Sequence, residues 1–143
     1  MPAEQQVEAV SKKLVELNPG FDGKITGVST KGTPSIESDV VSGLGFSTDQ
    51  VADISPILAL VGIKYLNCSG TSQGKNALSD LSPLQGMTLL TLSCSFTHVE
   101  DLSPLKGMPL ARLELSFTRV SDLSMLRSMK LSTLRINGTS VGD

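Results

Sequence analysis

A unit of 21 residues recurs along the chain and limits the folds that it can adopt. Residues 80–100, 101–121 and 122–142 align without a gap, and each begins with Asp-Leu-Ser. A longer unit at 53–79 matches them at both ends, and residues 40–52 match the second half of a unit. One such unit is too short to enclose a core, so neighbouring units must share one by stacking. The repeat therefore predicts a solenoid.

Within the unit 101–121 the residue pattern indicates one strand and one short helical turn. Leu113 and Leu115 alternate with polar residues, as in a strand that buries one face. The earlier Ser-Pro step favours a helix start, with Ser103 as its cap and Pro104 at the first helical position. A Gly-Met-Pro step then stops the turn. We expect an α/β solenoid with a parallel β-sheet on its concave face and short 3₁₀ or α turns on its convex face.

These units resemble the leucine-rich repeat family, in a short variety that carries Thr where the family more often has Asn. "DLSPLKGMPL" and "LSFTRVS" in 101–121 are similar to repeats of planctomycete-type bacterial proteins, and "DISP" at 53–56 is similar to a step of internalin-like repeats. Residues 7–26 look like the leader that precedes repeats in the former group. The resemblance implies an architecture and a binding role, without chemistry. It also implies that such repeats often occur in multi-domain proteins, including proteins that carry a Ser/Thr kinase domain.

The first 39 residues lack the repeat and are expected to cap it. Apolar residues at helical spacing predict an amphipathic helix of about four turns that stops at Asn18-Pro19-Gly20. Two β-like stretches follow at 23–30 and 35–46, with turn material at 31–34 or a tighter turn at Ser38-Asp39. We expect residues 1–39 to form a capping helix and β-hairpin and residues 40–143 to form the repeats. A separate functional role of the helix is the alternative.

The last unit has no comparable cap in the sequence, which stops at "LRINGTSVGD". The open edge of a parallel sheet can pair with another strand. We therefore expect either a piece of a longer protein or a homo-oligomer that covers the last strand.

Composition bears on the partners and the compartment. Twelve Lys and Arg against 14 Asp and Glu give a formal charge of −2, which offers no basic footprint for nucleic acid. No apolar leader and no run of about 18 apolar residues are present, so we expect no membrane contact and a cytoplasmic location. Cys68 and Cys94 fall at equivalent inward positions of adjacent strands. Free buried thiols are favoured there over a disulfide.

The chain offers no convincing catalytic, cofactor or metal site. His98, the only His, falls in a repeat loop and is interpreted as surface. "GTSQGKN" at 70–76 lacks the spacing of a phosphate-binding loop and is interpreted as a polar insertion. One Asp per unit favours repeated hydrogen bonding to a turn over catalytic carboxylates or a cation site; these are Asp53, Asp80, Asp101 and Asp122. We predict that the chain is not an enzyme and needs no cofactor.

The residues that alternate with the buried Leu form three outward columns. The third is nearly all Ser and is expected to serve the turn; it contains Ser47, Ser69, Ser95, Ser116 and Asn137. The residue types in the first two columns differ from repeat to repeat, so these positions can contact a specific partner. Phe96 and Phe117 follow the third column and are expected to stack on one rim, where they either shield the loop or dock a partner.

These columns predict a non-catalytic module that binds a protein partner through the concave sheet face and the Phe rim. The predicted contact residues are Tyr65, Asn67, Phe96, Arg112, Glu114, Phe117 and Arg135. The alternatives are a structural or self-assembly module, and the non-catalytic repeat arm of a larger bacterial protein such as a kinase.

Overall fold

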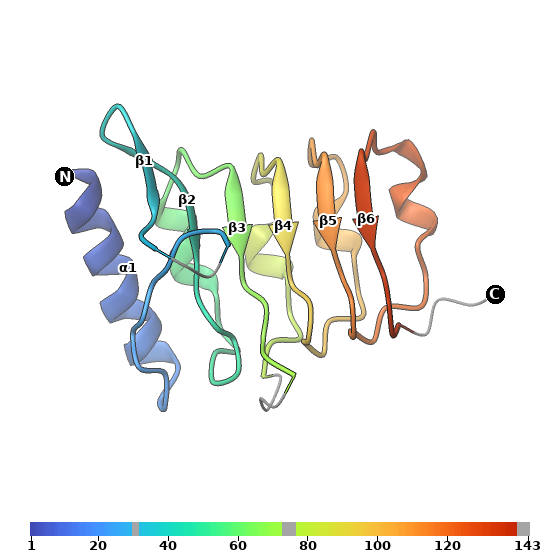
Figure 1. Ribbon diagram of the computed structural model, residues 1–143, viewed down its shortest axis with the longest axis horizontal. Helices are drawn as coiled ribbons and strands as arrows, with labels where there is room; N and C mark the ends of the chain where they lie inside the picture. Colours follow the sequence, from blue (N-terminus) through green and yellow to red (C-terminus); the bar gives the residue numbers. More distant parts are fainter. Residues whose placement is uncertain (30–31, 73–76, 140–143) are drawn as a thin grey trace.

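The repeats form a parallel sheet in which each strand lies beside the strand of the next repeat (Figure 1). The computed structural model describes residues 1–29, 32–72 and 77–139. In these residues six strands follow one another in chain order; β1 is antiparallel to β2, and all later pairs are parallel. The strands are β1 (Ser35–Glu37), β2 (Val40–Gly45), β3 (Tyr65–Asn67), β4 (Thr91–Ser93), β5 (Arg112–Glu114) and β6 (Thr133–Arg135).

Short 3₁₀ turns return the chain on the opposite side of the core, behind the sheet in Figure 1. They are η1 (Ser55–Ala59), η2 (Ser82–Leu84), η3 (Ser103–Leu105) and η4 (Ser124–Ser128). The expected Ser cap is wrong. Ser103 is the first residue of η3, and the carboxylate of Asp101 accepts its backbone N–H at 2.9 Å. The carboxylate two residues earlier caps the turn because it reaches an N–H that has no partner inside the helix.

Equivalent leucines from successive strands fill the core between the sheet and the turns. Leu66, Leu92 and Leu113 are paired in register and have no exposed surface. The next member, Leu134 on β6, is 37% exposed because no described residue stacks on it. Thr118 closes its unit as expected, since its hydroxyl donates to the carbonyl oxygen of Leu115 at 2.7 Å. The solenoid expected from the repeat is confirmed.

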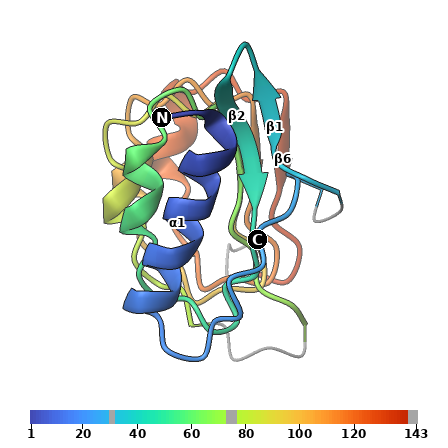
Figure 2. The same cartoon turned by 90° about the vertical axis from the view of Figure 1, so that its left-hand side faces the viewer.

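Helix α1 (Ala3–Leu17) covers the first end of the solenoid, between the sheet and the 3₁₀ turns (Figure 2). Val10 and Leu14 are buried, whereas Leu17 is exposed. Asn18 ends the helix and fixes it to the first repeat. Its side-chain nitrogen donates to the carbonyl oxygens of Leu14 and Asp53, both at 2.9 Å. No helix in the described ranges has the length and apolar character needed to cross a membrane.

The N-terminal β-hairpin turns at Ser38-Asp39, the tighter of the two expected sites. Both residues have positive φ angles, 50° and 61°, as a two-residue hairpin turn requires. The carboxylate of Asp39 accepts the backbone N–H of Ala3 at 3.0 Å, which connects the hairpin to the start of α1. The stretch 23–30 was expected to be β-like, but the described part of it pairs with the sheet only as an isolated bridge from Thr26. Residues 30 and 31 lie outside the described ranges.

Candidate partner-binding face

The N-terminal part of the outward sheet face is covered by the chain itself. The backbone of Thr26 exchanges two hydrogen bonds with Gly45, at 2.7 and 2.9 Å, and the chain then passes over β2. A Cβ atom placed on Gly45 would lie 2.7 Å from the carbonyl oxygen of Gly27, and one on Gly43 would lie 2.8 Å from a methyl carbon of Val28. The two glycines therefore make room for this segment.

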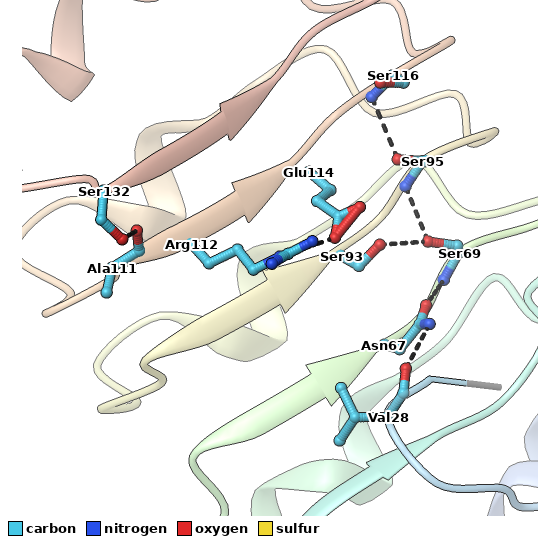
Figure 3. Close-up of polar contacts among 10 residues, drawn as sticks. All are labelled: Val28, Asn67, Ser69, Ser93, Ser95, Ala111, Arg112, Glu114, Ser116 and Ser132. Atoms are coloured by element: carbon cyan, nitrogen blue, oxygen red, sulfur yellow. Dashed lines mark hydrogen bonds and ion pairs between the residues drawn. The ribbon is translucent and has the colours of Figure 1, made fainter. Parts of the chain in front are cut away.

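Asn67 on β3 holds the covering segment at its inner border. Its side-chain nitrogen donates to the carbonyl oxygen of Val28 at 2.7 Å, and its side-chain oxygen accepts the backbone N–H of Ser69 at 3.0 Å (Figure 3). Both ends of this predicted contact residue are thus used inside the chain. Tyr65, on the same strand, is half-buried and lies beside Gly43.

The outward residues of β4, β5 and β6 are free of this segment, and we call them the open sheet face. They are Thr91, Ser93, Arg112, Glu114, Thr133 and Arg135. Arg112 Nε lies 3.0 Å from Glu114 Oε1, so these two charges neutralise each other (Figure 3). Arg135 is exposed and forms no ion pair with any residue that the structure describes. The open sheet face therefore carries one positive charge without a counterion among the described residues.

The serine column lies along one edge of the open sheet face and links neighbouring strand ends. Ser69 Oγ accepts the backbone N–H of Ser95 at 3.0 Å and lies 2.8 Å from Ser93 Oγ. In the same way, Ser95 Oγ accepts the backbone N–H of Ser116 at 3.2 Å (Figure 3). The hydroxyls of Ser69 and Ser95 thus join one repeat to the next instead of serving the turn, whereas Ser47 Oγ serves its turn as expected and accepts the backbone N–H of Asp49 at 3.3 Å. These hydrogen bonds between repeats, which we call the serine ladder, fix the spacing of the repeats next to Phe96 and Phe117.

Phe96 and Phe117 stack on this rim, as the sequence predicts. Their ring centroids are 4.8 Å apart with an interplanar angle of 11°. Phe117 is 52% exposed and Phe96 is half-buried. We call this pair the Phe rim.

The Phe rim adopts a backbone conformation that disfavours a bulky residue. Phe96 and Phe117 have φ angles of 55° and 57°, and the equivalent residues of the flanking repeats are Gly70 and Gly138. The left-handed conformation costs about 1–2 kcal/mol per residue, whereas a stacked pair contributes about 0.5–1.5 kcal/mol beyond its buried area. Neither ring belongs to the hydrophobic core or packs against it. Fold stability alone gives no reason for phenylalanine at these two positions.

The recurring aspartates serve the 3₁₀ turns, as expected. Asp101 accepts the backbone N–H of Ser103 at 2.9 Å, and this bond lowers the pKa of its carboxyl group. Asp80 and Asp122 make the same bond, with the same cause and direction of pKa shift. For Asp53 the largest cause of the lowered pKa is a side-chain hydrogen bond from Ser55. Each carboxylate is thus directed at its own turn, not at a shared reactive centre.

Cys68 and Cys94 are free thiols with no exposed surface. Burial raises the pKa of Cys68 to about 12 and also raises the pKa of Cys94 well above its ordinary value. Nucleophilic and metal-binding cysteines act as thiolates, so these two are unreactive in the folded protein. They act as small core residues.

Sequence reasoning missed the covering segment, although the sequence contains a signal for it. Gly43 and Gly45 stand two residues apart in a strand, where glycine often marks a close approach of another backbone. The polar loop expected at 70–76 is described only at its start, where Asp49 binds the backbone N–H and the hydroxyl of Thr71 at 2.8 and 2.7 Å. Residues 73–76 lie outside the described ranges.

Comparison with known proteins identifies similar solved structures. No protein-family model matches the chain, and no curated protein matches it. An internalin from Listeria monocytogenes, InlF, has a TM-score of 0.55 and 25% identity over 62% of this chain. Internalin C2 from the same organism has a TM-score of 0.47 and 24% identity, covering 64% of this chain and 50% of its own. The chain spans about a quarter of InlF, 26% of its length.

Proposed function

Because this chain is an internalin-like leucine-rich repeat protein, we propose that it is a non-catalytic module that binds a protein partner through the open sheet face and the Phe rim. One observation carries the proposal. The chain covers its own sheet face over β2 and secures the cover at Asn67, whereas in the described residues Arg112 and Arg135 on β5 and β6 stay exposed. A face with varied polar side chains over a hydrogen-bonded floor suits protein recognition.

Within this proposal the predicted contact residues have different roles. Arg112, Glu114 and Arg135 make polar contacts from the open sheet face, and Phe96 and Phe117 supply apolar area at its edge. The two remaining residues, Tyr65 and Asn67, mark the border with the covering segment.

A cytoplasmic location is part of the proposal. The two buried cysteines support it, because they directly follow the adjacent strands β3 and β4 and remain free thiols.

A steric block on the open sheet face tests the proposal. Thr133→Cys places a reactive thiol on this face, while Cys68 and Cys94 are buried and do not compete for the reagent. A polyethylene glycol maleimide attached there is expected to abolish binding of phage-displayed random peptides selected on the unmodified protein. The matched control is the same polymer on Lys106→Cys, at the end of η3 on the opposite side of the core. Equal binding by both conjugates, or a selection that yields no binders, would contradict the proposal.

The exposed end of the core favours a second candidate function, self-assembly through β6. Leu134 is 37% exposed, whereas its equivalents on the three preceding strands have no exposed surface. Covering this end with a second copy would bury it in the same way. Sedimentation at several protein concentrations is expected to show oligomers that Leu134→Asp abolishes, and a monomer at every concentration would remove this candidate.

A further inference from the structure

We propose that the Phe rim and Arg135 dock an acidic segment of the partner protein that carries an aromatic side chain. The inference rests on the proposed function and adds the chemistry of the segment that the face receives. It depends on three features of the structure: which surface of the rings is exposed, which charge is unpaired, and how far apart the two groups lie.

The Phe rim presents part of the Phe117 ring, including its edge, to solvent. One face of the Phe117 ring stacks on Phe96. Gly138 lies against one side of the ring, since a Cβ atom added to that glycine would collide with Cδ1 and Cε1. Phe117 is 52% exposed, so the parts of the ring that neither neighbour covers face solvent. Aromatic edges carry partial positive charge and prefer oxygen atoms or the face of another aromatic ring.

The unpaired charge next to the Phe rim is positive. Arg135 has no ion pair in the part of the chain that the structure describes, while Arg112 is neutralised by Glu114. The other outward residues of the open sheet face, Thr91, Ser93 and Thr133, are uncharged. The face thus carries one net positive charge in a chain whose formal net charge is −2. A partner segment complementary to it carries carboxylates.

The two groups are close enough to engage one short segment. The backbone N–H of Phe117 donates to the carbonyl oxygen of Asn137 at 2.7 Å, and Arg135 lies two residues before Asn137 on the same chain. Glu114 is paired with Arg135, so Phe117 lies opposite Gly138, three residues from Arg135, and the strand spacings place the Cα atoms of Phe117 and Arg135 about 11 Å apart. Side chains two and four residues apart in an extended peptide are separated by about 7 and about 13 Å. An acidic residue and an aromatic residue two to four positions apart in one short segment can therefore reach both long side chains at once.

Peptide selection with a charge reversal tests the docking site. Random short peptides displayed on phage are selected on the protein. The peptides that bind the unmodified protein but not the polyethylene glycol conjugate of Thr133→Cys are then sequenced. We expect them to combine Asp or Glu with Phe, Tyr or Trp, and to bind about tenfold or more weakly to Arg135→Glu. Lys106→Glu makes the same change of charge away from the face and is expected to bind normally. Arg135→Glu is expected to select Lys- or Arg-containing peptides instead.

A second variant tests the contribution of the Phe rim to the docking site. Phe117→Gly installs the residue that the chain carries at the equivalent position 138, where φ is 68°, so its backbone is compatible with the fold. We expect it to weaken the selected peptides about tenfold or more and to remove the preference for an aromatic residue. Binders that map to the face without acidic or aromatic enrichment, or unchanged affinity in Phe117→Gly and Arg135→Glu, would overturn this inference and leave the proposed function intact. If the selected peptides still bind the polymer conjugate of Thr133→Cys, both this inference and the proposed function are wrong.

Discussion

The side-chain nitrogen of Asn67 lies 2.7 Å from the carbonyl oxygen of Val28 and thereby connects β3 to the segment that covers the first part of the sheet face. Asn67 is 39 residues further along the chain than Val28, so this bond fixes a contact between distant segments. It marks the border between the covered and the open parts of the face.

Replacing Asn67 with Ala is expected to loosen the covering segment. The change removes the bonds to Val28 and Ser69 and leaves partly buried backbone groups without partners, which costs about 1–3 kcal/mol of unfolding free energy. Urea denaturation measures the loss, and hydrogen exchange at the Thr26 amide is expected to become faster. Thr91→Ala, on the open sheet face, is the control and is expected to change stability by less than about 0.5 kcal/mol. Unchanged exchange at Thr26 in Asn67→Ala would show that the bond does not hold the segment.

Replacing both rim phenylalanines with Gly is expected to leave the stability of the protein within about 1 kcal/mol of the parent. The loss of stacking and buried area is offset by relief of two left-handed backbone conformations. Thermal and urea unfolding measure the outcome. A loss of 3 kcal/mol or more, about the size of a core truncation, would mean that the rings serve the fold.

Leu113→Ala and Leu134→Ala remove the same atoms from equivalent positions and are expected to differ in effect. Leu113 has no exposed surface, so its truncation leaves a cavity and costs about 3–5 kcal/mol. Leu134 is 37% exposed, and its truncation is expected to cost about 1 kcal/mol. Urea unfolding of dilute protein measures both values. Equal losses would indicate that the end of the core is covered in solution.

The aspartates predict a loss of stability in acid. Hydrogen bonds to the turns lower the pKa of these carboxyl groups below 3.8 in the folded protein, so each contributes stability that is present above the unfolded pKa. That contribution is lost as the pH falls from about 5 through the lowered pKa values. The free energy of unfolding is measured between these pH limits. It is expected to depend less steeply on pH in the double variant Asp101→Asn/Asp122→Asn than in the parent protein. An unchanged dependence in this double variant would contradict the assignment.

The two cysteines are expected to resist thiol reagents until the protein unfolds. Burial raises the pKa of Cys68 to about 12, and both side chains lack exposed surface. Maleimide at pH 8 is therefore expected to label neither thiol in the native protein and both after denaturation without reductant. The Thr133→Cys variant supplies the positive control, since its added thiol is predicted to react at once. A failure to label both thiols in denatured protein would reveal a disulfide.

Much of the fold could be predicted because the repeat specifies the same local interactions several times. The alternation at Leu113 and Leu115 predicts the strand, and the columns of leucine predict its register. The Ser cap was wrong because Asp and Ser both favour turns, and only the path of the backbone decides which side chain reaches the free N–H. The serine ladder was missed because a column of hydroxyls in the sequence does not say which strand each one bonds.

The sequence by itself determined the solenoid, the inward leucine columns and the positions of Phe96 and Phe117, since periodic burial follows from residue spacing alone. The tertiary structure decided how much of the sheet face is available. Thr26 to Val28 have no repeat pattern, and their place over β2 depends on Gly43, Gly45 and Asn67, which come later in the chain. The exposure of the Phe117 ring and the lack of an ion pair for Arg135 among the described residues likewise depend on which neighbours each side chain meets after stacking. Contacts between segments distant in sequence have no period, and only the folded chain specifies them.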